Sequence, residues 1–131
     1  MEPKKHRIDR AEIERIQGLG ETELDSLPFG AIRLDKDGNV LRYNQTEADL
    51  VGRRKESVIG KNFFTDVAPC TNVQEFAGRF REGVQKRSLH TVFPFIFDLA
   101  TGALNVWVTL FYNDENDSSW VFIHAAPRKR K

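Results

Sequence analysis

The sequence contains a single cysteine, Cys70, in a setting that could make its thiol reactive. Cys70 follows Pro69 and precedes a predicted helix start, where free backbone N–H groups and the helix dipole can stabilise a thiolate. A small buried side chain without chemistry is an equally good interpretation of this residue taken alone. Because there is one cysteine, an internal disulfide and a multi-cysteine zinc site are both excluded.

Tyr43 and Glu47 form a second candidate pair, four residues apart across the start of a predicted short helix. This spacing can bring a phenol and a carboxyl group toward one ligand. The residues alone favour a local role instead, in which Tyr43 ends a strand and Glu47 completes a capping box with Asn44.

The histidines His6, His90 and His124 are the remaining candidates for acid–base or metal chemistry. A cysteine hydrolase needs a histidine base that is oriented by a carboxamide or an acid, and none of the three lies in such a motif. We therefore expect neither an enzyme nor a metal site. A thiol enzyme stays an alternative that would require a histidine within reach of Cys70.

Local patterns in the first half of the chain predict two short helices with a hairpin between them. Helix-like spacing of apolar residues over 9–19 predicts an amphipathic helix that ends near Gly18 or Gly20. Alternating apolar residues around Asp37-Gly38 predict a β-hairpin from Gly30 to Tyr43. Asn44 is a good N-cap for the helix that follows, which stops at Gly52.

The second half is predicted to be helical and then β. A short helical piece is expected from Lys55 to Ile59, and a longer helix from about Val73 to Lys86 with Asn72 as its cap, because Phe76, Phe80 and Val84 repeat every four residues. Three strands should follow at about His90–Leu99, Leu104–Tyr112 and Ser119–Ala125, with a first turn at Thr101-Gly102.

This order of elements predicts an α+β fold, in which a five-stranded antiparallel sheet has helices on one face. Pro94 lacks a backbone N–H donor, so its strand should lie at an edge or be interrupted.

Composition narrows the class of protein. A chain of 131 residues, with 40% hydrophobic and 30% charged residues, fits one globular domain. No apolar run approaches the length of a membrane-spanning helix, and 1–10 lacks the apolar region of a secretory signal, so we expect a cytoplasmic protein.

The basic residues 128–131 are expected to be a solvated tail, because no basic face or RNA-binding motif accompanies them and no nucleic-acid partner is indicated.

Two long runs carry a resemblance to a known family. The segments LDSLPFGAIRLDKDGNVLRYN (Leu24 to Asn44) and GRRKESVIGKNFFTDVAPCTNVQEFAGRFREGV (Gly52 to Val84) resemble the photoactive yellow protein family, and SSWVFIHA (Ser118 to Ala125) resembles the last strand of that family. The motif VIGKNFFTDVAPCT is far more specific than a generic sensory-domain match.

The resemblance implies the PAS fold and a blue-light photoreceptor. It implies a PAS photosensor domain at 24–126, an N-terminal helical leader at 1–23 that packs on it, and a basic tail at 127–131. It also implies that 4-hydroxycinnamic acid (p-coumaric acid) is attached to Cys70 as a thioester. By the same resemblance Tyr43 and Glu47 hold the phenolate oxygen of this chromophore, and Arg53 shields the pocket.

The family pattern also places further residues at the chromophore, and this chain departs from it at several of them. Phe63, Phe97, Leu99 and Thr101 are expected to bind the chromophore. Val51 stands where the family often has a threonine, and Leu99 and Thr101 stand where it often has a tyrosine and a methionine that speeds thermal return. We therefore expect slow recovery in the dark.

The implied chemistry makes demands on the pocket. A free phenol has a pKa near 10 and a glutamic acid about 4.3, so the pocket must reverse this order for Glu47 to donate a proton. Light would then trigger proton transfer and partial unfolding, because a buried unpartnered carboxylate costs several kcal/mol. A pigment-free PAS interaction module is the alternative. A downstream signalling protein, not identified by the sequence, and a monomer or weak dimer are expected.

Overall fold

The computed structural model describes residues 8–125, so His6 and the predicted basic tail lie outside the described residues. Within this range one antiparallel sheet contains the strands β1 (Gly30–Asp35), β2 (Val40–Tyr43), β3 (Leu89–Leu99), β4 (Gly102–Asn113) and β5 (Ser118–Ala125). Their order across the sheet is β2-β1-β5-β4-β3. The predicted five-stranded antiparallel sheet is therefore confirmed.

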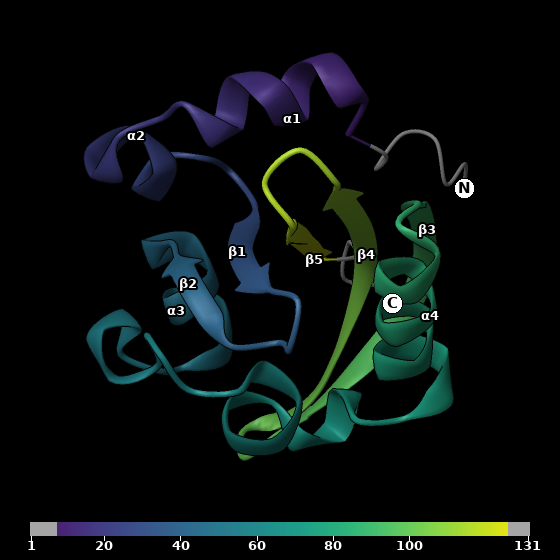
Figure 1. Ribbon diagram of the computed structural model, residues 1–131. Coiled ribbons are helices and arrows are strands. Elements are labelled where there is room, and N and C mark those ends of the chain that lie inside the picture. The colour runs from purple at the N-terminus through teal and green to yellow at the C-terminus, as the bar shows by residue number, and fades with distance from the viewer. Residues whose placement is uncertain (1–7, 126–131) are drawn as a thin grey trace.

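The helices α1 (Arg10–Gln17) and α2 (Glu21–Asp25) cover one face of the sheet (Figure 1). Ile13 and Ile16 of α1 are buried in an apolar cluster with Trp120 and Phe122 of β5. The predicted helix over 9–19 is thus confirmed and ends at Gly18, whereas α2 was not predicted. Because α1 and α2 lie on the face opposite the other helices, the prediction that helices cover only one face is wrong.

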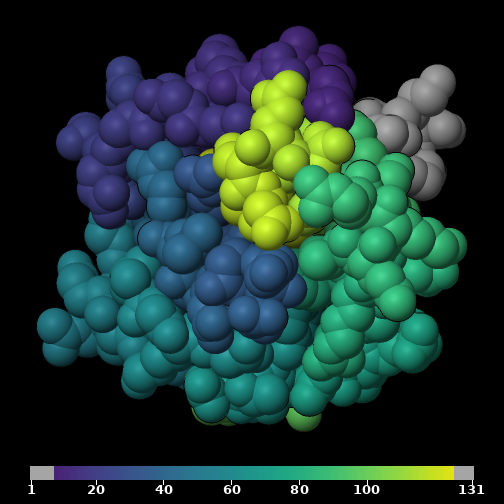
Figure 2. All heavy atoms as spheres, in the orientation of Figure 1, coloured from purple at the N-terminus to yellow at the C-terminus, as the bar shows by residue number. Residues whose placement is uncertain are grey.

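Helix α1 also contacts the end of β4. In Figure 2 the purple spheres of α1 lie beside yellow spheres from near the end of the chain. The side-chain amide of Asn113 at the end of β4 donates a hydrogen bond to Gln17 Oε1 at 3.0 Å. This contact fastens α1 to the sheet by a polar bond in addition to apolar packing.

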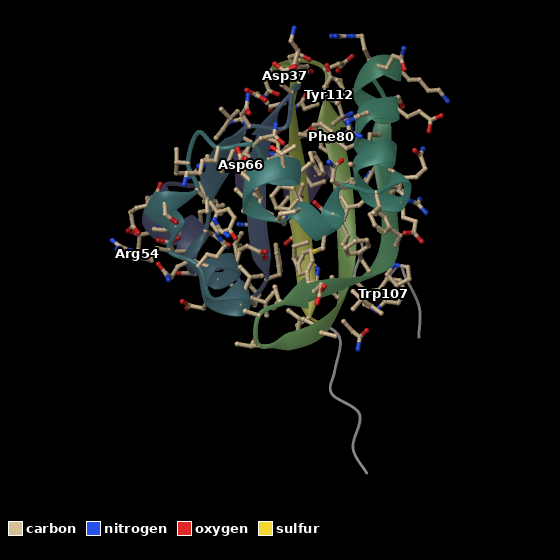
Figure 3. All side chains as sticks on the ribbon, turned by 90° about the horizontal axis from the view of Figure 1, so that it is seen from below. Asp37, Arg54, Asp66, Phe80, Trp107 and Tyr112 are labelled. Atoms are coloured by element: carbon tan, nitrogen blue, oxygen red, sulfur yellow. The ribbon has the colours of Figure 1, made fainter. Side chains whose placement is uncertain are left out.

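The other face of the sheet carries α3 (Gln45–Val51), α4 (Arg79–Lys86) and four short helical turns. The turns are 3₁₀ at Lys55–Ser57 and Pro69–Thr71, and π-helical at Phe63–Val67 and Gln74–Gly78. Phe80 lies on the inner side of α4, as Figure 3 shows, and packs against Phe64 with ring centroids 5.0 Å apart. The main core therefore lies between these helices and the sheet.

The predicted hairpin and the helix after it are both confirmed. β1 and β2 pair in antiparallel register, and Gly38 between them has a φ of 92°, a conformation that favours glycine. Asn44 caps α3 by accepting a hydrogen bond from the backbone N–H of Glu47. The helix ends at Gly52, whose φ of 75° provides the left-handed C-terminal cap.

The helix predicted over Val73 to Lys86 is divided, and Asn72 does not cap it. A wide π-helical turn precedes α4, and Gly78 N–H donates to Val73 O. The Asn72 side chain instead accepts a hydrogen bond from the Arg81 guanidinium at 3.0 Å, which removes it from the helix start. Cys70 consequently lies in its own 3₁₀ turn and not at the N-terminus of a long helix, so the predicted dipole effect on its thiol does not apply.

The last three strands are slightly longer than predicted, and their first turn is shifted by one residue. Leu99 pairs with Gly102, which leaves Ala100 and Thr101 as a two-residue turn. Pro94 lies in β3, one of the two edge strands of the sheet, as its missing donor requires.

Candidate functional site

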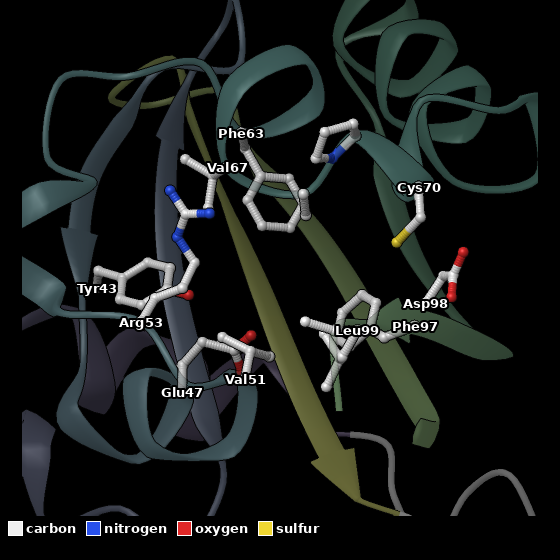
Figure 4. Close-up of a pocket in the computed structure, with 13 residues that line it drawn as sticks. Tyr43, Glu47, Val51, Arg53, Phe63, Val67, Cys70, Phe97, Asp98 and Leu99 are labelled. Atoms are coloured by element: carbon white, nitrogen blue, oxygen red, sulfur yellow. The ribbon is translucent and has the colours of Figure 1, made fainter. Parts of the chain in front are cut away.

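A cavity of about 510 Å³ opens between α3, the turns at Phe63–Val67 and Pro69–Thr71, and the end of β3. Figure 4 shows its lining in close-up. The lining residues come from the end of β2, the helical segment after it, the end of β3 and the β3–β4 turn: Tyr43, Glu47, Val51, Arg53, Phe63, Val67, Ala68, Pro69, Cys70, Phe97, Asp98, Leu99 and Ala100.

Most of the residues that the sequence singled out meet at this cavity. Seven of them line it, namely Cys70, Tyr43, Glu47, Arg53, Phe63, Phe97 and Leu99. Thr101 is exposed in the β3–β4 turn and lies outside the lining, whereas its neighbour Ala100 is part of it. Both residues of this two-residue turn are exposed, but only Ala100 borders the cavity.

Cys70 stands on one side of the cavity, and Tyr43 and Glu47 stand on the other (Figure 4). The Cys70 side chain is half-buried and its sulfur points into the cavity. The turn that carries it is held by Thr71, whose hydroxyl donates to Ala68 O at 2.6 Å. A group attached to this sulfur would therefore extend toward the phenol and the carboxyl group.

The hydrogen bonds of Asn44 explain why the Glu47 carboxyl group is not used in capping the helix. The side-chain oxygen of Asn44 accepts from Glu47 N–H at 3.0 Å, but Asn44 N–H donates to Ala31 O at 3.1 Å. A full capping box would use the Glu47 carboxylate for that N–H. Since Ala31 has taken this place, the carboxyl group belongs to the cavity and not to the helix cap.

Glu47 is buried, with 1% of its surface exposed, and its carboxyl oxygen Oε1 has no hydrogen-bond partner among residues 8–125. Burial raises the pKa of Glu47 to about 8, because a charged carboxylate is poorly solvated there. Glu47 is therefore largely protonated at neutral pH and can act as a hydrogen-bond donor.

Tyr43 is also buried and keeps its proton. Burial, and next the nearby Glu47 carboxyl, raise the pKa of the Tyr43 phenol above its usual range, while the charge of Arg53 acts in the opposite direction. Tyr43 and Glu47 thus present two O–H donors at one end of the cavity.

The two arginines of the VGRR motif have different surroundings. Arg53 is half-buried and lines the cavity, whereas Arg54 is exposed and points away from the body of the protein (Figure 3). Arg53 therefore places the positive charge of this motif at the cavity.

Sequence reasoning missed several lining residues, namely Val67, Ala68, Pro69, Asp98 and Ala100. Val67, Ala68 and Pro69 lie within the same motif as Cys70, so proximity in sequence was a usable signal. Asp98 and Ala100 reach the cavity only because β3 ends beside Cys70, which no local pattern indicates.

Metal-binding clusters and membrane-spanning helices are both absent from the described part of the chain. Residues 8–125 hold no group of three or more His, Cys, Asp or Glu side chains that could bind a metal ion. In the same range no helix has the length and apolar character needed to cross a membrane.

Comparison with known proteins first defines the class. Residues 24–125 match the family model described as the PAS fold. The photoactive yellow protein domain of the sensor histidine kinase Ppr from Rhodospirillum centenum superposes with a TM-score of 0.81 and 44% identity, over 88% of this chain and 98% of that one. The predicted fold is thus confirmed as a PAS fold.

Two relatives then define the family. A photoactive yellow protein from Rhodothalassium salexigens is 46% identical over 105 residues, 80% of this chain and 84% of the relative. Another, from Halochromatium salexigens, is 46% identical over 108 residues, 82% of this chain and 86% of the relative. The chain therefore belongs to the photoactive yellow protein family of blue-light photoreceptors, as its motifs predicted.

Proposed function

We propose that this photoreceptor carries 4-hydroxycinnamic acid as a thioester on Cys70, with the phenol end of the chromophore facing Tyr43 and Glu47. The observation that carries the proposal is the placement of Cys70 and these two O–H donors on opposite walls of one cavity. Phe63, Phe97 and Leu99 supply apolar walls suited to a planar aromatic group.

The protonation states in the cavity support an anionic partner. The protonated carboxyl of Glu47 and the phenol of Tyr43 can both donate to one oxygen, and hydrogen bonds to a charged acceptor are short and strong. The buried Glu47 Oε1, which no residue of the described range satisfies, further indicates that the carboxyl group is part of a ligand site. Arg53 adds a positive charge at the cavity.

When bound, the chromophore supplies the absorption of visible light and the photoisomerisation. The role of Glu47 is to hold a proton in the dark and to release it when its hydrogen bond weakens. A buried carboxylate without a partner costs several kcal/mol, comparable with the whole stability of a domain. Partial unfolding that exposes Glu47 to water would relieve this cost and provide the signal.

A non-enzymatic sensor fits the cavity better than a thiol enzyme does. A thiol enzyme needs a histidine base near Cys70, and among the described residues the cavity lining includes no histidine. The related domain in Rhodospirillum centenum belongs to a sensor histidine kinase. By analogy we propose that this chain acts in the cytoplasm on a downstream signalling protein, as a monomer or weak dimer.

Intact mass and absorption test the attachment. The full chain, mixed with an activated ester of 4-hydroxycinnamic acid, should gain the mass of one acyl group and a visible absorption band. Cys70→Ala and Cys70→Ser should fold but remain unmodified and colourless. A coloured, covalently modified Cys70→Ala protein would contradict the proposal, and wild-type protein that folds but takes up no acyl group would favour the pigment-free interaction module.

A further inference from the structure

Gly30, the first residue of β1, lies in unusually close contact with Glu47. A Cβ atom placed on Gly30 would stand 2.0 Å from Glu47 Oε1, 3.0 Å from Cδ and 3.1 Å from Cβ. The three nearest atoms all belong to this one side chain. A carbon and an oxygen need about 3.5 Å, so a methyl group at Gly30 would force the carboxyl oxygen to move by more than about 1 Å.

The backbone of Gly30 does not itself require glycine. The glycines with positive φ are Gly38, Gly52, Gly60 and Gly102, and Gly30 is not one of them. Gly30 pairs with Ile123 in a regular antiparallel ladder, a position where residues with side chains are normally preferred. A glycine inside a strand often marks a close approach by another group, and here that group is the Glu47 side chain.

We propose that Gly30 is a positioning residue for Glu47: the space left by its missing side chain holds the Glu47 carboxyl group in the wall of the cavity. Oε1, the atom nearest to this space, is also the buried oxygen that lacks a partner within the described range. The Asn44 side chain fixes the backbone of Glu47 by a hydrogen bond, and the absence of a side chain at Gly30 leaves room for the Glu47 carboxyl group. This placement does not depend on the function proposed above, whereas any effect of Gly30 on proton release by Glu47 rests on that function.

Gly30→Ala tests the placement, with Gly18→Ala as the matched control. Gly18 ends α1 at a φ of −88°, and a Cβ there would meet only Arg15 O, at 3.7 Å, which is an ordinary contact. Gly30→Ala should push the Glu47 carboxyl into the cavity, toward water. The fraction of Glu47 that is protonated at a given pH should then fall, with a proton affinity at least about tenfold lower.

The measurement is the titration of the Glu47 side-chain carbon by NMR in pigment-free full-length protein labelled at glutamate. A downward shift of about one pKa unit or more in Gly30→Ala, and none in Gly18→Ala, is expected. An unchanged Glu47 titration in Gly30→Ala would overturn the proposal. Because no pigment is needed, this result is independent of whether Cys70 is acylated.

A double-mutant cycle keeps the proposal testable if Gly30→Ala folds poorly. In Glu47→Ala protein the carboxyl group is gone, so adding Gly30→Ala should change the denaturation midpoint far less than it does beside Glu47. Recovery of folding in the Gly30→Ala, Glu47→Ala protein would support the proposal. Equal damage in both backgrounds would overturn it, since the strand and not Glu47 would then require the glycine.

Discussion

Asn44 accepts a hydrogen bond from the backbone N–H of Glu47, while its own N–H donates to Ala31 in β1. Its side-chain amide also donates to Leu24 O and Phe29 O, at 2.9 and 3.0 Å. This one buried residue thus joins the start of α3 to β1, to α2 and to the segment that follows α2. The backbone of Glu47 and the end of α2 thus share one hydrogen-bonding residue.

Glu47→Gln tests the proton donor. Glutamine keeps an N–H donor but cannot deliver a proton, so the loaded protein should absorb at longer wavelength in the dark and take its proton from solvent after illumination. The measurements are the visible spectrum and time-resolved infrared absorption, with the exposed Glu56→Gln as the control. A wild-type infrared spectrum without a protonated-carboxyl band that disappears on illumination would rule out the donor role.

The stability of pigment-free protein should depend on the pH through Glu47. The pKa of Glu47 is raised from 4.5 to about 8 on folding, so between these values the folded protein binds more protons than the unfolded chain. The free energy of unfolding should therefore fall as the pH rises from about 4.5 to about 8 and level off above, by a few kcal/mol in total. Denaturant unfolding at each pH, compared with Glu47→Gln, measures this; parallel curves for the two proteins would contradict it.

Recovery in the dark should respond to Ala100 more than to Thr101. Ala100 and Thr101 are both exposed in the turn, but only Ala100 lines the cavity, so a methionine at position 100 is the better placed to bring a polarizable thioether to the chromophore. Ala100→Met should speed recovery about tenfold, equivalent to about 1.4 kcal/mol of barrier, and Thr101→Met should change it little. Flash photolysis at matched pH and temperature checks this. A faster Thr101→Met than Ala100→Met would show that the turn rearranges around the bound chromophore.

The Lys55 ammonium should stabilise the contact between α2 and the 3₁₀ turn that follows α3. It contacts Asp25 Oδ2 at 2.5 Å and Glu21 Oε2 at 3.3 Å, with 15% of the Lys55 side chain exposed. Asp25 also accepts from the N–H of Gln45 at 2.8 Å. Against the opposing effect of burial, the hydrogen bonds from Lys55 and from Gln45 N–H lower the pKa of Asp25, so this contribution should be lost only in acid.

Lys55→Ala should lower the free energy of unfolding by about 1 kcal/mol, with a loss that shrinks at high salt. Lys86→Ala is the control, because the Lys86–Glu82 pair is exposed on both sides and should contribute almost nothing. Denaturant unfolding at low and high salt measures both. Equal losses in the two variants would show that the Lys55 pair is an ordinary surface contact.

The sequence by itself determined the features that depend on neighbouring residues. The hairpin around Gly38, the Asn44 cap and the stop at Gly52 are set by turn and cap chemistry within a few positions, so local patterns predicted them. The resemblance to the family likewise named seven of the residues that line the cavity, although only Phe63 and Cys70 among them lie in the motif around Cys70.

Only the tertiary structure decided which of these residues share one environment. The choice between a capping and a cavity role for Glu47 depended on Ala31, which lies on another element and takes the Asn44 N–H. The raised pKa of Glu47 depends on burial of this side chain by the whole fold. The position of its carboxyl group depends on Gly30, which lies 17 residues earlier in the sequence. Contacts between distant segments form because the apolar faces of the sheet must be covered on both sides, and a local pattern carries no information about which side chains then meet.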